Sequence, residues 1–489
     1  MSTAVSRLRV DKTKGVSKPD NMSWPDFLTM LLHIGAEIEH GLMVEYLYAA
    51  YSLGGEQVPA GQREKVLRWR DNMLVVAKEE MGHLLTVQNI LTLLGAPMNL
   101  ERSDFPWDVP YYPFRFTLEP LALQSLSCYI YAEMPQDEEK PQDPEKPEEV
   151  KGRQLPKRYS QLEPSEKNRI FENACECAKG GKTHHVATIY NEIIKIIQDP
   201  VCIPDSAFHE ETYDYQASWD DWGRGYHPNP RPLDAQGNPL EVKWKPPPAS
   251  HRPANVLISR AATRTQAVAA LRQIATQGED PHLIVDDLGE PSHYERFLEL
   301  YQQLEKIKWC PTRRVPTNPT TVDTPQNRKA GSYIVAETSR MWAQLFNRRY
   351  RMLLTYLAHT FRLARVSRSD VPSVRGATMH RVFGEMYNLK TIAGILVEMP
   401  LYPDPNDPRR AGPPFEMPYS VTLPPTEVDC WRMHRDLLSS SNEICSGLLA
   451  GADSDGKRYL QALCDIDRET VTWIDRTLAG CGPNERHGL

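Results

Sequence analysis

The sequence lacks several features that would place it in common protein classes. No apolar run in its 489 residues approaches the ~20 residues that a membrane-spanning helix needs. The N-terminus lacks the apolar core of a secretory signal. Basic residues are not in excess, because the formal net charge is -7, and this excludes a general attraction to nucleic acid. We therefore expect a cytoplasmic protein that binds neither membrane nor nucleic acid.

Cysteines and β-strand patterns are also scarce. The nine cysteines are odd in number and scattered, which fits reduced thiols better than a framework of disulfides. No haem attachment motif is present. Apolar residues recur at helical spacing and almost nowhere in strict alternation, so the sequence predicts an all-α fold.

The predicted helices fall into two groups. Before residue 311 the sequence predicts four long helices and two shorter ones. The long ones span 24–54, 62–94, 164–198 and 291–308, and the shorter ones 118–134 and 263–278. We interpret residues 20–310 as one four-helix bundle, with loop insertions at 136–160 and 200–256. The first insertion consists almost only of proline and charged or polar residues. The second carries Trp219, Trp222 and Tyr226, which are candidates for a lid over a binding pocket.

A second helical region follows a linker rich in proline and threonine, residues 311–330. Residues 331–489 form a C-terminal helical domain, with predicted helices at 331–366, 374–398, 426–450 and 456–478. No motif in this half builds one focused site. We interpret it as structural or as the surface of a homodimer.

Two Glu-x-x-His pairs carry the strongest chemical signal. One pair is Glu80 and His83, and the other is Glu290 and His293. Residues three apart lie on one helix face, so each pair can offer a carboxylate and an imidazole to the same point. Carboxylates can bridge two cations and imidazole suits iron. Two such pairs, with one Glu from each of two further helices, are the ligand set of a carboxylate-bridged dimetal site.

The remaining two carboxylates come from the first and third long helices. Glu39 has apolar or small neighbours at all four adjacent helical positions, and it is our candidate on the first helix. On the third helix, Glu192 enters a run of isoleucines and is the candidate there. Five residues are alternative ligands or neighbours that support the ligands: Glu37, His184, His185, Tyr46 and Tyr190.

The same segments carry a family resemblance. Ala36 to Tyr46, Glu79 to Leu85 and Ser292 to Phe297 together resemble the ferritin-like domain of the iminophenyl-pyruvate dimer synthases, and two of these spacings also resemble rubrerythrin. The resemblance implies a ferritin-like core and a non-haem di-iron site with dioxygen as co-substrate. It assigns Glu39, Glu80, His83 and His293 as ligands. The sequence departs from the family in two places. One is Thr188, where relatives carry a Glu and Glu192 is the substitute. The other is Pro291, which follows Glu290 and places it at the start of the predicted helix.

The predicted function is an oxygen-dependent di-iron oxidase or oxygenase. The resemblance implies a small amino-acid-derived substrate from natural-product metabolism. Two alternatives stay open. One is a ferritin-like scaffold that binds a partner or ligand without redox turnover. The other is an imine-coupling enzyme that resembles the dimer synthases.

Overall fold

The computed structural model describes most of the chain, namely residues 10–11, 15–108, 112–134, 149–150, 153–154, 162–177, 185–218, 256–279, 291–364, 374–417, 419–420, 422–451 and 454–480. The chain forms two compact units. Unit 1 contains residues 1–99 and 106–311, and unit 2 contains residues 100–105 and 312–489. Both units are built from helices, as the sequence predicts. Among the described residues, strands occur only as two short antiparallel pairs: β1 (Val10–Asp11) with β2 (Gly15–Val16), and β3 (Glu149–Val150) with β4 (Arg153–Gln154).

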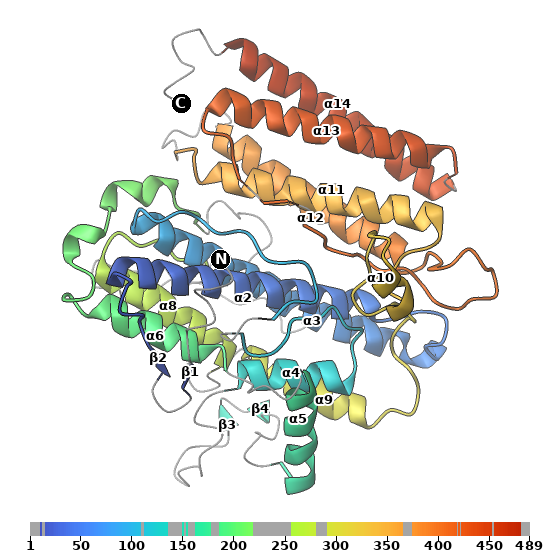
Figure 1. Ribbon diagram of the computed structural model, residues 1–489. Coiled ribbons are helices and arrows are strands. Elements are labelled where there is room, and N and C mark those ends of the chain that lie inside the picture. Colours follow the sequence, from blue (N-terminus) through green and yellow to red (C-terminus); the bar gives the residue numbers. More distant parts are fainter. Residues whose placement is uncertain are drawn as a thin grey trace. The chain divides into compact units, whose positions relative to one another are not determined.

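The longest helices of unit 1 lie side by side. They are α2 (Trp24–Ser52) and α3 (Arg63–Leu93), drawn in blue in Figure 1. Ser23 caps the start of α2, because its hydroxyl accepts a hydrogen bond from the N–H of Asp26 at 3.2 Å. Four shorter helices pack against this pair: α4 (Leu123–Glu133), α6 (Ala187–Gln198), α8 (Arg264–Glu279) and α9 (His293–Glu305). The remaining elements are α5 (Pro164–Cys177) against α4, and the 3₁₀ turns η1 (Ala60–Gln62), η4 (Asp205–Ala207) and η5 (Glu210–Tyr215).

In the four-helix bundle, the place of the third helix is taken by two helices, α4 and then α6. α6 begins where α4 ends, because the N–H of Val186 donates to the carbonyl of Ala132 at 3.0 Å. α4 packs with α9, and α6 packs with α8 and α2. The prediction of one continuous helix over 164–198 is therefore wrong. Gly180 and Gly181 interrupt that stretch of sequence, and a glycine pair weakens a helix through its backbone entropy.

The place of the fourth helix is likewise taken by two helices, α8 and α9. A capping box fixes the start of α9: the N–H of Glu295 donates to the Ser292 hydroxyl at 3.3 Å, and the N–H of Ser292 donates to the Glu295 carboxylate at 3.1 Å. The helix therefore begins at His293. The spacing from residue 290 to residue 293 is consequently not a spacing along one helix.

Segments 216–218 and 256–261 are bound to α3 by buried hydrogen bonds. Asn89 donates to the carbonyls of Ala217 and Ser259, at 2.8 and 2.9 Å. Leu257 passes so close to α3 that a Cβ on Gly82 would meet its carbonyl oxygen at 2.7 Å. These segments flank the predicted lid, whose Trp219, Trp222 and Tyr226 lie outside the described residues.

Unit 2 is a helical bundle of its own. Its main helices are α11 (Glu337–Thr360), α12 (Val374–Leu396), α13 (Glu427–Leu449) and α14 (Ser454–Gly480). The last three start and end within two residues of their predicted bounds, and α11 is six residues shorter at each end than predicted. α12 and α13 pack against α11, and α14 packs against α13. Residues 312–330, which the sequence marks as linker, belong to unit 2 and include the short helix α10 (Pro325–Ala330).

One cysteine differs from expectation. Cys128 is disulfide-bonded, so the prediction of reduced thiols throughout is wrong at this position, whereas six other described cysteines are free.

Among the described residues, α2 has the length and composition of a membrane-crossing helix, and 67% of its most apolar window is buried inside the protein.

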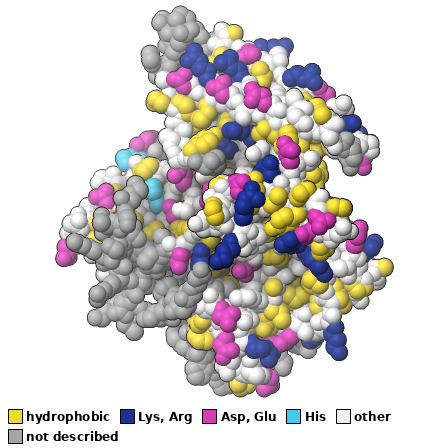
Figure 2. All heavy atoms as spheres, turned by 45° about the vertical axis from the view of Figure 1, so that its right-hand side comes forward, with side chains coloured by type: hydrophobic (Ala, Val, Ile, Leu, Met, Phe, Trp, Pro, Cys, Tyr) yellow, Lys and Arg dark blue, Asp and Glu magenta, His cyan; other side chains and the backbone are white. Residues whose placement is uncertain are grey.

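On the face of the molecule in Figure 2, basic and acidic side chains are interspersed, with no large patch of one sign.

A buried ion group links three helices of unit 2. Arg349 on α11 lies 3.0 Å from Glu385 on α12 and 2.9 Å from Asp467 on α14, and all three side chains are buried. The two carboxylates share one guanidinium, so its loss would leave them unpaired in the core.

We predict that Arg349→Met lowers the free energy of unfolding by roughly 3–5 kcal/mol, because two buried carboxylates lose their cation. Urea denaturation followed by circular dichroism measures this change. The control is Arg432→Met, which removes an exposed ion pair with Asp429 and is expected to stay within about 1 kcal/mol of the wild type. Equal effects of the two substitutions would contradict the prediction.

Candidate metal centre

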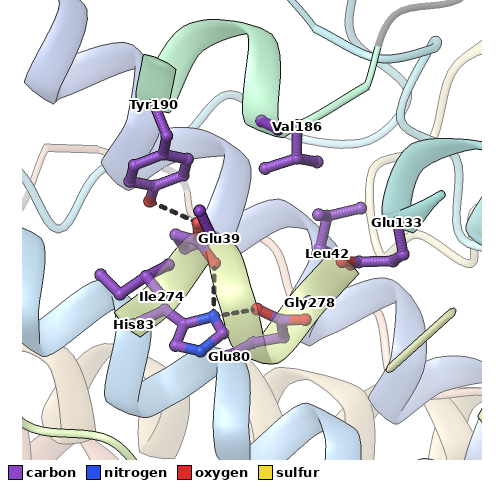
Figure 3. Close-up of a pocket in the computed structure, with 11 residues that line it drawn as sticks. Glu39, Leu42, Glu80, His83, Glu133, Val186, Tyr190, Ile274 and Gly278 are labelled. Atoms are coloured by element: carbon purple, nitrogen blue, oxygen red, sulfur yellow. Dashed lines mark hydrogen bonds and ion pairs between the residues drawn. The ribbon is translucent and has the colours of Figure 1, made fainter. Parts of the chain in front are cut away.

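Five buried side chains from four helices converge inside unit 1. They are Glu39 on α2, Glu80 and His83 on α3, Glu133 at the end of α4 and His293 at the start of α9, and each is at most 3% exposed. Their donor atoms form two triads, Glu39–Glu80–His83 and Glu80–Glu133–His293, and within each triad the atoms lie within 4.8 Å of one another. Glu80 belongs to both triads. Figure 3 shows Glu39, Glu80 and His83 side by side, with Glu133 entering from α4.

The carboxylate of Glu80 lies between two imidazoles. Its Oε2 is 2.9 Å from Nδ1 of His83, and its Oε1 is 2.8 Å from Nδ1 of His293. Nδ1 of His83 is also 3.4 Å from Oε2 of Glu39. The two rings are 5.5 Å apart between centroids. Each histidine therefore presents Nδ1 to the interior of the cluster.

The outward nitrogens of both histidines have partners of their own. Nε2 of His83 lies 2.8 Å from Oε1 of Gln277 on α8, and Nε2 of His293 lies 3.0 Å from Oε2 of Glu79. An acceptor at Nε2 keeps the proton on that nitrogen, so the lone pair of Nδ1 is directed into the cluster. Metal-binding histidines in proteins are commonly held in this way.

Two tyrosines hold the outer carboxylates. The hydroxyl of Tyr46 donates to Oε1 of Glu133 at 2.8 Å, and the hydroxyl of Tyr190 donates to Oε1 of Glu39. Gly278 on α8 leaves room for this arrangement, because a Cβ there would lie 2.8 Å from Oε2 of Glu133. Each carboxylate is therefore fixed through one oxygen, which leaves the other oxygen available to the centre of the cluster.

Burial and mutual charge shift the pKa of every member of the cluster. Burial raises the pKa of Glu39 to about 7, and burial together with the Glu80 charge raises the pKa of Glu133 to about 8. Burial also acts to raise the pKa of Glu80, but His293 and His83 outweigh it and hold that pKa well below its usual value. Burial lowers the pKa of His293, but Glu80 and the other carboxylates outweigh this and raise it to about 10. Glu80 in the same way raises the pKa of His83. The carboxylates thus attract positive charge, which a proton or a metal ion between the donors can supply.

The cluster fits a pair of divalent metal ions. Oε1 of Glu80 and Nδ1 of His293 are both buried without a hydrogen-bond partner among the described residues, although they lie only 2.8 Å apart. Two acceptor atoms facing one another in this way are suited to share a cation. Carboxylate oxygens and imidazole nitrogens together suit iron and manganese.

A cavity of about 10 Å³ opens beside the cluster, which is about the space that one water molecule needs. It is lined by the acidic residues and His83 together with apolar side chains, including Leu42, Val186 and Ile274. The centre therefore has room for one small ligand in an otherwise apolar surrounding.

Comparison with known proteins agrees with this geometry. Residues 32–302 match the family described as Ferritin-like. The chain belongs to the ferritin-like family. It is also 25% identical over 431 residues to dichlorochromopyrrolate synthase of Lentzea aerocolonigenes, an alignment that covers 80% of this chain and 36% of the relative. The chain thus spans about a third of the relative's length. No solved structure matches the chain significantly.

The ferritin-like centre brings together four of the six ligands predicted from the sequence: Glu39, Glu80, His83 and His293. The prediction of Glu192 is wrong. Its carboxylate is 19% exposed and pairs with Lys195 at 3.1 Å, because the face of α6 that meets the centre carries Val186, Ala187 and Tyr190. Glu290 lies outside the described residues.

Glu133 is the donor that sequence reasoning missed. A signal was present, because Glu133 follows the apolar stretch of the short helix predicted at 118–134. Helical periodicity is longer over 164–198, so the sequence favours that stretch, and not the short helix at 118–134, as the third helix of the bundle.

The supporting residues fall into three groups. Tyr46 and Tyr190 contact the carboxylates. Glu37 lies outside both triads and accepts hydrogen bonds from Tyr112 and Asn99. Nδ1 of His185 is 2.9 Å from the Tyr131 carbonyl, near the end of α4, so this ring contacts the backbone. His184 lies outside the described residues.

We predict that Glu133→Ala reduces metal binding from two ions per chain to one, because it removes a donor from the Glu80–Glu133–His293 triad only. Glu192→Ala is the matched control and should keep both ions. Metal content by mass spectrometry, after loading with iron(II) and removal of excess metal, measures the difference. Loss of an ion in Glu192→Ala, with none lost in Glu133→Ala, would reverse our assignment.

Proposed function

We propose that the protein is a di-iron oxidoreductase that uses dioxygen as co-substrate. The observation that carries this proposal is the pair of donor triads that share Glu80. Glu39, Glu80 and His83 would hold one ion, and Glu80, Glu133 and His293 the other. Two iron ions held there would supply the electrons and the open coordination positions for reductive activation of dioxygen.

The protein's own residues define the chemistry of this centre. Gln277 and Glu79 accept from the outward nitrogens of the two histidines and so fix the orientation of both rings. Tyr190 and Tyr46 do the same for the carboxylates of Glu39 and Glu133. These contacts hold the donors in place before a metal arrives, and this reduces the reorganisation that binding and reaction require.

The apolar wall around the cavity keeps water away from the reacting atoms. Leu42, Val186 and Ile274 line it beside the charged donors. Electrostatic interactions between the donors and their cations are strengthened when bulk water is excluded. Competing reactions with solvent are suppressed for the same reason.

The substrate class is proposed from the relative. Its name describes the synthesis of dichlorochromopyrrolate, a small molecule, and this supports a small-molecule substrate from natural-product metabolism. The resemblance to the dimer synthases implies that this substrate is derived from an amino acid, and it makes an imine-coupling reaction the alternative. Because the chain spans about a third of the relative, the proposal covers the oxidative centre and not the relative's whole reaction.

The decisive experiment measures oxygen uptake by protein loaded anaerobically with iron(II). We expect about two irons per chain, rapid oxygen uptake on mixing and a change in the visible absorption. His83→Ala should lower iron content and bring oxygen uptake to background, because it removes an imidazole donor from the cluster. His209→Ala is the control, since His209 is an exposed residue that pairs with Glu211.

Two outcomes would contradict the proposal. Wild-type protein that binds iron but takes up no oxygen would favour the scaffold without redox turnover. Full oxygen uptake by a folded His83→Ala variant would show that the oxidation occurs at another site.

A further inference from the structure

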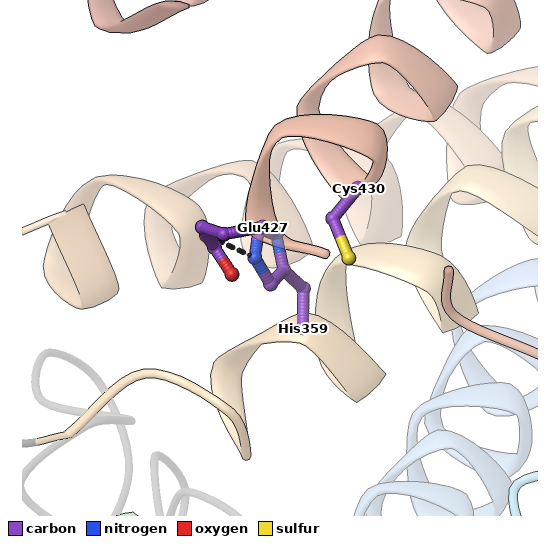
Figure 4. Close-up of side chains that lie close together, drawn as sticks. All are labelled: His359, Glu427 and Cys430. Carbon is purple, nitrogen blue, oxygen red and sulfur yellow. Dashed lines mark hydrogen bonds and ion pairs between the residues drawn. The ribbon is translucent and has the colours of Figure 1, made fainter. Parts of the chain in front are cut away.

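A second cluster of metal-binding side chains lies in unit 2. Glu427 and Cys430 on α13 and His359 in the last turn of α11 are all buried, at 5%, 0% and 0% exposure. A carboxylate oxygen, the sulfur and a ring nitrogen from these residues lie within 4.8 Å of one another. Figure 4 shows the three side chains converging between the two helices. The sequence of this half predicts no focused site.

The geometry of α13 explains how the cluster forms. Glu427, Cys430 and His434 are spaced at i, i+3 and i+7, so they lie along one face of the helix. That face meets α11, because α11 and α13 pack together. His359 lies between the two ends of the row: its Nε2 is 2.7 Å from Oε1 of Glu427, and its Nδ1 is 2.9 Å from Nε2 of His434.

The hydrogen bonds allow two protonation patterns for the two rings. Only one proton fits between Nδ1 of His359 and Nε2 of His434, and Nδ1 of His434 is buried without a hydrogen-bond partner among the described residues. Where His434 donates this proton, Nε2 of His359 carries a proton and donates to Glu427. Where His359 donates it, its Nε2 presents a lone pair to the Glu427 carboxylate, and a metal ion can bind between these two groups.

The position of Cys430 favours a metal ion over a proton. A thiol is not needed to satisfy a histidine–carboxylate pair, but a thiolate, an imidazole and a carboxylate are together the donors that zinc takes in proteins. The thiol of Cys430 donates to the Pro424 carbonyl at 3.4 Å, and Nη1 of Arg362 lies 3.3 Å from the sulfur. A bound divalent ion would replace the thiol proton and would balance the charges of Glu427 and the resulting thiolate.

We propose that His359, Glu427 and Cys430 bind a divalent transition metal, with zinc best matched to these donors. In this arrangement Nε2 of His359 is a ligand, and His434 orients the ring through Nδ1, as outer partners of metal-bound histidines do. Three protein donors leave one position of a four-coordinate ion for a further small ligand. The bound ion links α11 to α13.

Cobalt(II) tests this proposal on the full-length protein, because it takes the place of zinc and reports its ligands by colour. A thiolate ligand gives an intense near-ultraviolet charge-transfer band. The described donors of the unit 1 centre contain no sulfur, so that centre cannot produce the band even when it also binds cobalt. We expect the band to saturate at one cobalt per chain and to disappear when zinc is added.

Variants then assign the band to its residues. Cys430→Ser, which is nearly the same size, should abolish it. Cys445→Ser, another buried cysteine on α13, should leave it intact. His434→Gln should keep the band but weaken cobalt binding by about 10–100-fold, as expected for loss of an outer hydrogen-bond partner.

Two results would overturn the proposal. The first is wild-type protein that binds cobalt without a thiolate band, a result that depends on no variant. This would mean that a proton bridges His359 and Glu427 and that the cluster is a hydrogen-bonded core. The second is a band that persists in Cys430→Ser, which would place the thiolate ligand elsewhere.

Discussion

The interior of unit 1 depends on balancing buried charge around Glu80. This carboxylate and its neighbours Glu39 and Glu133 are removed from water, where unpaired charge is very costly. Both imidazoles lie within hydrogen-bonding distance of Glu80, so a cation held between these groups, either a proton or a metal ion, provides the compensation. Divalent ions would provide it more completely, since one carboxylate is already shared between two donor triads. The packing of the four helices that carry the donors, α2, α3, α4 and α9, serves this arrangement.

The helix breaks of the bundle occur next to the same cluster. α4 ends at Glu133, α8 ends one residue after Gly278, and α9 begins at His293. A helix that ends beside the core can direct a metal-donor side chain along the helix axis, whereas a helix that passes the core can do so only from its side.

Most of the fold and four of the five donors of the centre could be predicted from the sequence. Helical periodicity located α2 and α3 closely, and the spacing of Glu80 and His83 on one helix identified the core of the centre. The third position could not be predicted, because it is assembled from α4 and α6 across a long insertion, and periodicity carries no information about which helices align. The same limit hid the His359–Glu427–Cys430 cluster, whose members come from two helices that only tertiary packing brings together.

The most direct test of the central claim is anomalous X-ray diffraction at the iron edge from crystals grown anaerobically with iron(II). Our account predicts two peaks, one among Glu39, Glu80 and His83 and the other among Glu80, Glu133 and His293, with the Glu80 carboxylate contacting both. Two peaks would establish a dinuclear centre with Glu80 as its bridge. A single peak, or iron bound away from these five residues, would contradict it.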